Sequence, residues 1–400
     1  MRQETRIKKL HERFVKKFGI EPQDTFVSPG RIELLGNHTD HNNGKVLVSS
    51  IDLNILACVG PRDDDKVVFY SHGYKKMELS LARLGKKEKE YGTSIALIRG
   101  VLYRMKELGY KIGGFSVCSE SSVPNGAGVS SSAAFECLIA KIVSYYYNDN
   151  SIPSFELAKI AQFAETVYFN KPCGLLDQSG IAIGGINYID FKDTAHPEIN
   201  NIKIKVKGYQ FIIINTGDDH SKLTPCYAAI KDDMKAVSNF FNVNVLREVT
   251  ESEFYASQAE IVSTCGERAW LRGKHYFEEN NRVQKAYDSL LDKNLVGLLE
   301  MMNESGLSSY HQLKNCYVNS EDENLPKALR KVKEIDPSCY SRVHGGGFAG
   351  TMLMIVDKKK LKEVLPVLQE TFGAKNVMKV SLVEYGTSVF KEENGKYIYF

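Results

Sequence analysis

A run of small residues, SSVPNGAGVSSSAAFE (121–136), is the feature that most limits how this chain can fold. The alternating pattern of 113–120 before it predicts a strand, and the apolar periodicity of 131–147 predicts a buried helix. A strand that turns into a helix through such a loop leaves unpaired amides at the positive end of the helix, where anions bind. Because the loop has no Lys or Arg, a bound anion would depend on amides and hydroxyls. An ordinary turn with a serine cap is the alternative interpretation.

The rest of the pattern predicts a mixture of helices and strands. We expect helices at 2–18, 93–109, 154–169, 323–335 and 357–373, and strands at 46–60, 66–71, 209–217 and 351–356, with a further strand near the C-terminus. The polar segment 193–203 carries turn residues and is the best candidate for a boundary between two lobes, 1–204 and 205–400. We therefore expect an α+β fold of two mixed lobes with a cleft between them, and the last strand is a candidate to return to the first lobe.

Composition excludes several classes of protein. The 400 residues include 52 Lys and Arg against 49 Asp and Glu, a net charge of +3, which argues against nucleic-acid or anionic-membrane binding. No apolar run is long enough to span a bilayer, and the charged N-terminus does not look like a signal peptide. The eight cysteines form no CxxC pair, so we expect reduced thiols rather than zinc ligands or disulfides. These features favour a cytoplasmic protein, and the sequence leaves its oligomeric state open between a monomer and a small homo-oligomer.

A polar cluster lies in PGRIELLGNHTDHNNG, residues 29–44, which we expect to be irregular. Its charged and imidazole side chains are Arg31, Glu33, His38, Asp40 and His41. A metal site, and hence a metal-dependent hydrolase, is one interpretation, although the spacing does not obviously suit a metal and local hydrogen bonding would explain it equally well.

Two acidic residues stand out in AETVYFNKPCGLLDQSG, residues 164–180. Glu165 falls in a predicted helix, and Asp177 follows a Pro-Cys-Gly turn among apolar neighbours. A carboxylate in such surroundings needs partners, so Asp177 is a candidate general base and Glu165 a candidate metal ligand. Helix capping or ordinary ion pairing is the alternative for either residue.

A glycine loop, HGGGFAG (344–350), formally matches GxGxxG. The predicted order of helix, loop and strand excludes the dinucleotide fingerprint, which needs strand, loop and helix. Three consecutive glycines still indicate a close approach of backbone or ligand, or a tight turn.

Taken together and in this order, the four segments resemble the GHMP kinase superfamily and, within it, the galactokinases. The matching stretches are Pro29-Gly30-Arg31 with 36–44 (GNHTDHNNG), 124–134 (PNGAGVSSSAA), Ala164-Glu165 with 172–178 (PCGLLDQ), and 345–350 (GGGFAG). A weaker match is His220-Ser221 followed by Tyr227. The resemblance runs from about residue 26 to 356 and implies the two-lobed GHMP kinase fold. Its N-terminal lobe is similar to ribosomal protein S5 domain 2, and its C-terminal lobe is ferredoxin-like.

The resemblance also implies a reaction, the ATP- and Mg²⁺-dependent phosphorylation of the C1 hydroxyl of galactose. Asp177 would accept the hydroxyl proton, while Arg31 would orient that carboxylate and stabilise charge on the phosphoryl group. Ser132 and Glu165 would hold Mg²⁺. The other implied roles are ATP binding by Pro124, Gly126, Ala127, Gly128, Ser130, Ser131, Ser132 and Ala133, sugar binding by Asn37, His38, Asp40, Gly174 and Tyr227, and closure over the substrates by Gly345, Gly346 and Gly347.

Three positions depart from the galactokinase pattern. Asn37 stands where the family has a Glu that contacts the outer sugar hydroxyls around C6, His41 replaces a Tyr, and Val343-His344 replaces a usual Met-Thr. Loss of negative charge at 37 would admit a C6 carboxylate, so galacturonate or a related sugar is the alternative substrate. A non-catalytic sugar and ATP sensor is a third alternative, which the complete catalytic set disfavours.

Overall fold

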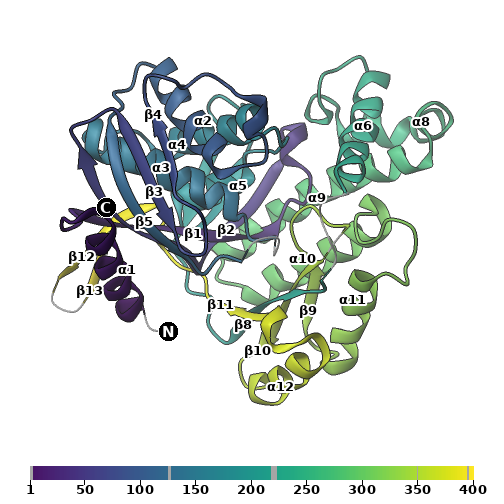
Figure 1. Cartoon of the computed structure of the whole chain (residues 1–400). Helices are drawn as coiled ribbons and strands as arrows, with labels where there is room; N and C mark the ends of the chain where they lie inside the picture. The colour runs from purple at the N-terminus through teal and green to yellow at the C-terminus, as the bar shows by residue number, and fades with distance from the viewer. Residues whose placement is uncertain (1–2, 125–127, 218–222, 349, 394–395) are drawn as a thin grey trace.

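A nine-stranded sheet organises the first half of the chain (Figure 1). The computed structural model describes residues 3–124, 128–217, 223–348, 350–393 and 396–400. The strands of this sheet are β1 (Asp24–Leu35), β2 (Lys45–Arg62), β3 (Lys66–Ser71), β4 (Met77–Ser80), β5 (Gly114–Ser121), β6 (Ile186–Asp190), β7 (Glu198–Ile202), β12 (Ser388–Glu393) and β13 (Lys396–Tyr399). Their order is β13-β12-β1-β2-β5-β3-β4, with β6 paired to β2 and β7. Only the β3–β5 pair is parallel among these pairings.

Helices cover both faces of this sheet. Successive side chains of a strand point to opposite faces, and β1 and β2 carry apolar residues on both, so each face needs a helix layer to bury them. Phe26 and Ala57 belong to the large core beneath α2 (Ser94–Glu107), α3 (Ser131–Tyr147), α4 (Ser154–Phe163) and α5 (Leu176–Ile183). Their neighbours Val27 and Leu56 pack instead with Leu10 and Phe14 of α1 (Gln3–Phe18). This alternation places the helices that carry the candidate site on one face and α1 on the other.

A four-stranded antiparallel sheet organises the second lobe, in the order β11-β8-β10-β9. Its strands are β8 (Tyr209–Asn215), β9 (Tyr340–Val343), β10 (Thr351–Asp357) and β11 (Val377–Val380). The central run FIII of β8 is buried on both faces, as its continuous apolar sequence predicts. The helices of this half are α6 (Thr224–Phe240), α7 (Glu251–Ala256), α8 (Gln258–Cys265), α9 (Glu267–Leu291), α10 (Leu295–Ser308), α11 (Asn324–Ile335) and α12 (Leu361–Phe372).

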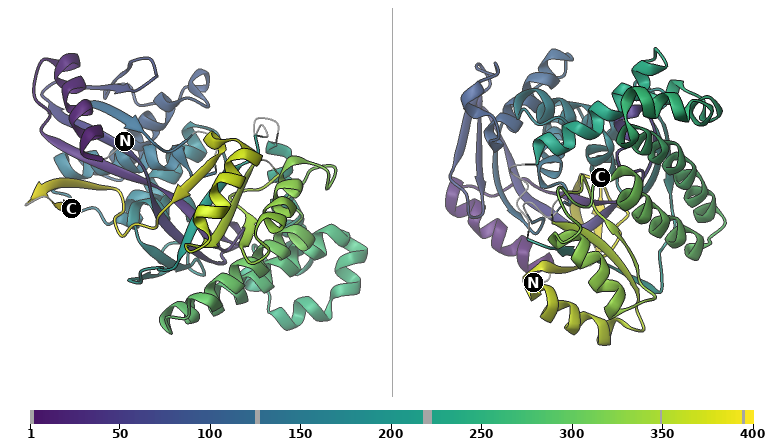
Figure 2. Two further views of the ribbon diagram at one scale, coloured as in Figure 1. Left: turned by 90° about the horizontal axis from the view of Figure 1, so that it is seen from below. Right: turned by 90° about the vertical axis from the view of Figure 1, so that its right-hand side faces the viewer.

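The end of the chain crosses back to the first lobe, as two further views show (Figure 2). Strand β12 pairs with β1 through the register Thr25 to Phe390, and β13 extends the same edge. The connection before it hydrogen-bonds to β2, where Ser50 and Asp52 meet the backbone of 381–383. The two lobes are thus joined by two covalent crossings as well as by side-chain contacts.

Most predicted helices and strands are confirmed, and a few local expectations are wrong. Residues 29–35 are not irregular, because β1 continues through them with register shifts at Pro29/Gly30 and Glu33/Leu35 that absorb the turn-forming residues. The segment 193–203 contains the strand β7, whose EINNI sequence pairs with β6, and the lobe boundary expected there stays a prediction. The predicted helix 154–169 ends at Phe163 and continues as a π turn over Ala164–Tyr168.

The short strand β9 was also missed, so the glycine loop joins two strands rather than a helix and a strand. The dinucleotide interpretation stays excluded, since a loop between antiparallel strands has no helix N-terminus. All eight cysteines are free thiols, five of them buried, as predicted. No helix in the described part of the chain combines the length and hydropathy needed to cross a bilayer.

Candidate active site

An arginine–carboxylate pair lies where β1 meets the start of α5. Arg31 donates from Nε to Asp177 Oδ1 at 2.7 Å, and its Nη2 lies 2.6 Å from the same oxygen. Ser130 donates its hydroxyl to the other oxygen, Oδ2, at 2.5 Å. Burial alone would raise the pKa of Asp177, but Arg31, Ser130 and Lys171 outweigh it, so the pKa lies below its usual range. Asp177 is therefore an ionised carboxylate, and 28% of its side chain remains exposed.

The N-terminus of α3 presents unpaired amides beside this pair. Ser130 precedes the helix with φ of 59°, a left-handed conformation unusual for a residue with a Cβ, and no side chain caps the helix. The amides of Ser131, Ser132 and Ala133 open the helix, which is the arrangement that binds anions. Gly128 adopts φ of 68°, and its carbonyl accepts a hydrogen bond from Arg31.

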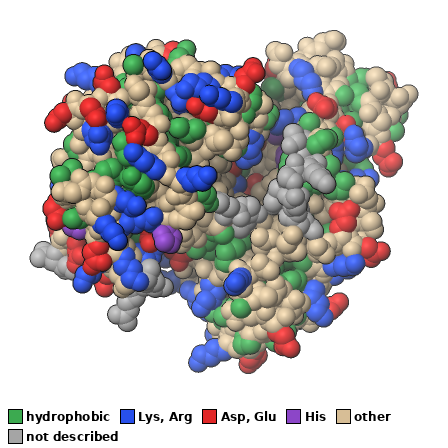
Figure 3. Space-filling view, in the orientation of Figure 1, with side chains coloured by type: hydrophobic (Ala, Val, Ile, Leu, Met, Phe, Trp, Pro, Cys, Tyr) green, Lys and Arg blue, Asp and Glu red, His purple; other side chains and the backbone are tan. Residues whose placement is uncertain are grey.

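The predicted ATP-binding residues are thus brought to one place as far as they are described. Pro124 ends the described part of the strand-side loop, and Gly126 and Ala127 lie outside the described residues. His220 and Ser221, the weaker match, lie outside them as well. The surface is hollowed where the first lobe meets the helices of the second (Figure 3).

The two predicted metal ligands are in direct contact. Ser132 donates its hydroxyl to Glu165 Oε1 at 2.7 Å, and Lys171 donates to the same oxygen at 2.9 Å. Gln178 donates to Oε2 at 2.7 Å, and Glu165 is 1% exposed. Two oxygen donors suit Mg²⁺, a hard cation that keeps water and phosphate oxygens as its other ligands. Among the described residues, no group of three or more His, Cys, Asp and Glu is arranged to hold a metal ion.

Asp40 and Gly174 are packed against each other next to α5. A Cβ at position 174 would lie 1.6 Å from Asp40 Oδ2, so only glycine fits there. The backbone amide of His41 donates to Asp40 Oδ1 at 2.9 Å. Burial, and then the charge of Asp177, raise the pKa of Asp40. The sequence placed Asp40, Gly174 and Asp177 in one site, and the structure brings them together.

The histidines of this region are neutral at pH 7. Burial lowers the pKa of His38 to about 4 and holds the pKa of His41 well below its usual range. His344 is 2% exposed, with its pKa also lowered by burial and by Arg31, whose Nη1 lies 3.4 Å from its Nε2. His41 and His344 therefore do not add positive charge at the candidate sugar site.

Side chains from three directions hold the glycine loop by its carbonyl groups. Asn37 donates from Nδ2 to the Gly345 carbonyl at 2.8 Å, and the Tyr227 hydroxyl donates to the Gly347 carbonyl at 3.0 Å. The Gly346 carbonyl lies 3.0 Å from His38 Nε2 and accepts from Asn315 Nδ2 at 3.2 Å. The loop lies over the predicted sugar residues and is tied to both lobes.

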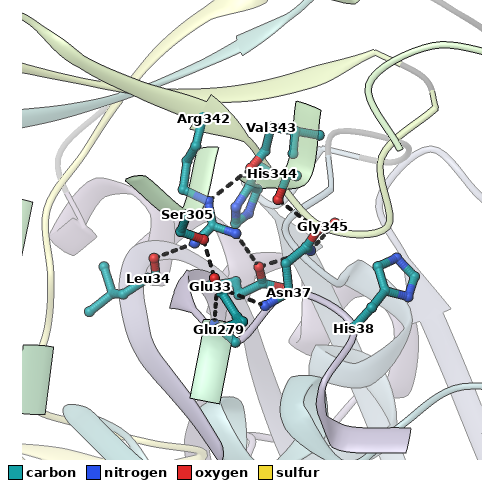
Figure 4. Close-up of polar contacts among 12 residues, drawn as sticks. Glu33, Leu34, Asn37, His38, Glu279, Ser305, Arg342, Val343, His344 and Gly345 are labelled. Carbon is teal, nitrogen blue, oxygen red and sulfur yellow. Dashed lines mark hydrogen bonds and ion pairs between the residues drawn. The ribbon is translucent and has the colours of Figure 1, made fainter. Parts of the chain in front are cut away.

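Asn37 itself differs from the expectation, since its side chain points into the protein (Figure 4). It is 1% exposed, and its Nδ2 also donates to Glu33 Oε1 at 3.0 Å. Its Oδ1 accepts from Asn315 Nδ2 at 2.8 Å and from the Ser309 hydroxyl at 3.4 Å. The amide is fully used by protein partners and offers no free group to a sugar.

Sequence reasoning missed the partners of this amide. Glu33 was noticed only as a member of a polar cluster, and Arg342 and Asn315 were not noticed at all. The one available signal was the i, i+4 spacing of Glu33 and Asn37 on either side of Gly36. Arg342 and Asn315 come from distant segments, so no local pattern could have linked them to Glu33.

Comparison with known proteins agrees with this geometry. Residues 12–61 match the galactokinase galactose-binding signature, and residues 96–185 match the GHMP kinases N terminal domain. A galactokinase of Clostridium tetani is 30% identical over 360 residues, 89% of each chain. One of Clostridium acetobutylicum is 30% identical over 92% of this chain and 94% of its own.

Solved structures show the same fold. The crystal structure of Lactococcus lactis galactokinase complexed with galactose superposes with a TM-score of 0.81 at 24% identity, covering 96% of this chain and 99% of the other. The mevalonate kinase of Methanococcus jannaschii gives a TM-score of 0.60 at 17% identity over 90% of this chain and 98% of its own.

The match over residues 96–185 assigns the chain to the GHMP kinases, and the two-lobed fold agrees with this class. The clostridial relatives narrow this class, because their identity extends over 89% or more of both chains. The chain belongs to the galactokinase family and is a sugar kinase.

Proposed function

We propose that this enzyme transfers the γ-phosphoryl group of ATP to the C1 hydroxyl of galactose, giving galactose 1-phosphate and ADP. The observation that carries the proposal is the ionised, partly exposed Asp177 held between Arg31 and Ser130 at the N-terminus of α3. A carboxylate beside a helix N-terminus that can bind phosphate is the arrangement that phosphoryl transfer to an alcohol needs, and this supports the proposal.

In this proposal Asp177 accepts the proton of the C1 hydroxyl as that oxygen attacks the phosphoryl group. Arg31 holds the carboxylate through two nitrogen atoms and faces the charge that builds up on the transferred group. The α3 amides and serine hydroxyls bind the phosphate chain in place of basic side chains. Most of the rate enhancement then comes from positioning and fixed dipoles.

Mg²⁺ would be held by Ser132 and Glu165, and when bound it would neutralise charge on the phosphate oxygens. Lys171 now shares Glu165 Oε1 with Ser132, so metal loading requires this ammonium group to move away. The Lys171 side chain is 58% exposed, so water can receive it.

We assign the sugar to His38, Asp40, Gly174 and Tyr227, and the closing loop to Gly345, Gly346 and Gly347. Asn37 acts on the sugar only through that loop. Galactose is the proposed substrate, because residues 12–61 match a galactose-binding signature and the clostridial relatives are galactokinases. Galacturonate stays the alternative, and the sugar panel below decides between them. We further propose a cytoplasmic enzyme that acts as a monomer or small homo-oligomer.

The test is an ADP-release assay with ATP, Mg²⁺ and a panel of free sugars. The panel contains galactose, galacturonate, N-acetylgalactosamine, glucose and arabinose. The proposal expects galactose to have the highest kcat/KM. Faster turnover of galacturonate, or no turnover of any sugar while galactose and ATP both bind, would contradict it.

A further inference from the structure

A buried ion pair joins the two lobes behind the glycine loop (Figure 4). Arg342 of β9 lies with its Nη2 2.6 Å from Glu33 Oε1 of β1, and the two side chains are 0% and 6% exposed. The same guanidinium donates to the Leu34 carbonyl and, from Nε at 3.1 Å, to the Val343 carbonyl. Every one of these contacts either crosses between β1 and β9 or holds the strand that leads into the glycine loop.

Asn37 couples this ion pair to the loop. Its Nδ2 bridges Glu33 Oε1 and the Gly345 carbonyl, at 3.0 and 2.8 Å. Its backbone is fixed independently, because Glu279 accepts from the Gly36 amide at 2.9 Å and His275 Nε2 lies 2.9 Å from the Asn37 carbonyl. Because the backbone at 36–37 is held in this way, a movement of the Glu33 carboxylate would move the Asn37 carboxamide, which in turn holds the Gly345 carbonyl.

A carboxylate at position 37 is incompatible with this arrangement. A Glu there would bring a second acid to within about a hydrogen bond of Glu33, and two buried carboxylates that close cannot both be ionised. It would also lose the donor that now reaches the Gly345 carbonyl. The Asn at 37 departs from the galactokinase signature. It is thus the residue that fits beside a buried carboxylate at 33, because its amide can donate a hydrogen bond to that carboxylate.

We propose that Glu33, Asn37 and Arg342 act together to position the glycine loop over the sugar site. The Asn at 37 is then matched to the buried carboxylate at 33, which it links to the Gly345 carbonyl. Glu33 and Arg342 are positioning residues, acting on the substrate through Gly345. The kinetic part of this inference rests on the proposed galactokinase activity.

The charged groups around Glu33 come from four elements. They are Arg342 of β9, Arg31 of β1, Glu279 of α9 and Asp177 of α5. Burial raises the pKa of Glu33 to about 7 despite the two arginines, whereas Arg282, His275 and Arg342 outweigh burial at Glu279 and lower its pKa to about 2. Glu279 is thus always charged and cannot share a proton with a second acid, so an acid at 37 would compete with Glu33 alone.

The test compares Asn37→Glu, Glu33→Gln and the double variant that carries both changes. We expect Asn37→Glu to lower kcat/KM for galactose by roughly 100-fold, because one of two adjacent buried acids must be protonated. Glu33→Gln leaves Arg342 without its anion and should cost roughly 10- to 100-fold. The double variant restores one carboxylate and one carboxamide, so it should recover to within roughly 10-fold of the wild type.

Two readouts separate positioning from a general loss of structure. The galactose KM should change more than the ATP KM in both single variants, and the defect of Asn37→Glu should deepen from pH 6 to pH 8.5 as the shared proton is lost. Glu90→Gln is the matched control, since Glu90 also pairs with a buried arginine, Arg99 at 2.7 Å. It should alter thermal stability without changing the galactose KM.

The inference is overturned if Asn37→Glu is as active as the wild type, or if the double variant shows the product of the two single losses. If the wild-type enzyme does not phosphorylate galactose, the proposed function fails, but the matching of Asn37 to Glu33 is still decided by thermal unfolding. In that case the double variant must melt above Asn37→Glu, and equal or lower melting would refute the matching of the two residues.

Discussion

Two arginine–carboxylate pairs that share strand β1, Arg31–Asp177 and Arg342–Glu33, behave differently. Asp177 accepts from Arg31 through two nitrogens and from Ser130, keeps 28% of its side chain exposed, and has a lowered pKa. Glu33 accepts from Arg342 and one carboxamide, is 6% exposed, and has a pKa raised to about 7. The same pair of residue types thus gives an ionised, partly exposed carboxylate where hydrogen-bond donors are plentiful, and a buried carboxylate with a raised pKa where donors are few.

The largest expected effect comes from removing the charge of Asp177, the partly exposed carboxylate. Asp177→Asn removes the proton acceptor but keeps the shape, so kcat should fall by roughly 10³-fold or more while galactose still binds. Steady-state kinetics with isothermal titration of galactose measures the two effects. A variant that keeps near wild-type kcat would show that Asp177 is not the base.

The buried pair should show itself in stability instead. The pKa of Glu33 is raised from 4.5 to about 7, so the folded protein binds this proton more tightly than the unfolded chain does. Its contribution to the free energy of unfolding is complete below about pH 4.5 and is lost as the pH rises toward 7, by up to about 3 kcal/mol. Urea unfolding of the wild type and of Glu33→Gln at several pH values measures this contribution of Glu33 to the free energy of unfolding.

In that experiment the wild type should lose stability relative to Glu33→Gln between pH 4.5 and 7. A difference between the two proteins that stays constant across this window would mean that burial does not shift the pKa of Glu33. Glu279, whose pKa is about 2, does not titrate there and contributes a constant background.

Exchanging each arginine for lysine should separate the two pairs by their kinetic signature. Arg31→Lys loses the two-nitrogen contact with Asp177 and should lower kcat by roughly 30-fold, since a lysine cannot reproduce the planar fork. Arg342→Lys should instead raise the galactose KM and lower the melting temperature. Identical changes of kcat and KM in both variants would show that the two ion pairs do not differ in function.

The smallest expected effect concerns the sugar side of the site. Gly174→Ala puts a Cβ into the space of the Asp40 carboxylate, which must move, so the galactose KM should rise by roughly 10-fold with kcat little changed. The ATP KM serves as the internal control. An unchanged galactose KM would indicate that Asp40 does not contact the sugar.

Part of the predicted phosphate site follows from local signals, since Ser130 to Ala133 lie at one helix end. The contact of Asp177 with Arg31, 146 residues away, could be expected only from the family resemblance. The course of β1 through Pro29 and Gly30 was not predictable in the same way. Their sequence predicts a turn. They form a strand because they pair with β2, and register shifts in that pairing accommodate the proline and the glycine.

The surroundings of the predicted sugar residues were harder to predict from sequence, because their contacts come from segments far apart in the chain. Asn37 was expected to face the substrate, yet Asn315 and Ser309 turn its amide inward from more than 270 residues away in sequence. The partner of Glu33 is Arg342, 309 residues distant. A family signature describes which residue types recur at a position but not where a substituted side chain points.

The central claim is phosphoryl transfer from ATP to C1 of galactose, and ³¹P NMR of the product tests it most directly. Incubation of the wild-type enzyme with galactose, ATP and Mg²⁺ should give one new phosphomonoester signal coupled to the anomeric proton. The signal should be absent with Asp177→Asn. A phosphomonoester at C6, or phosphate released to water without a sugar product, would contradict the account.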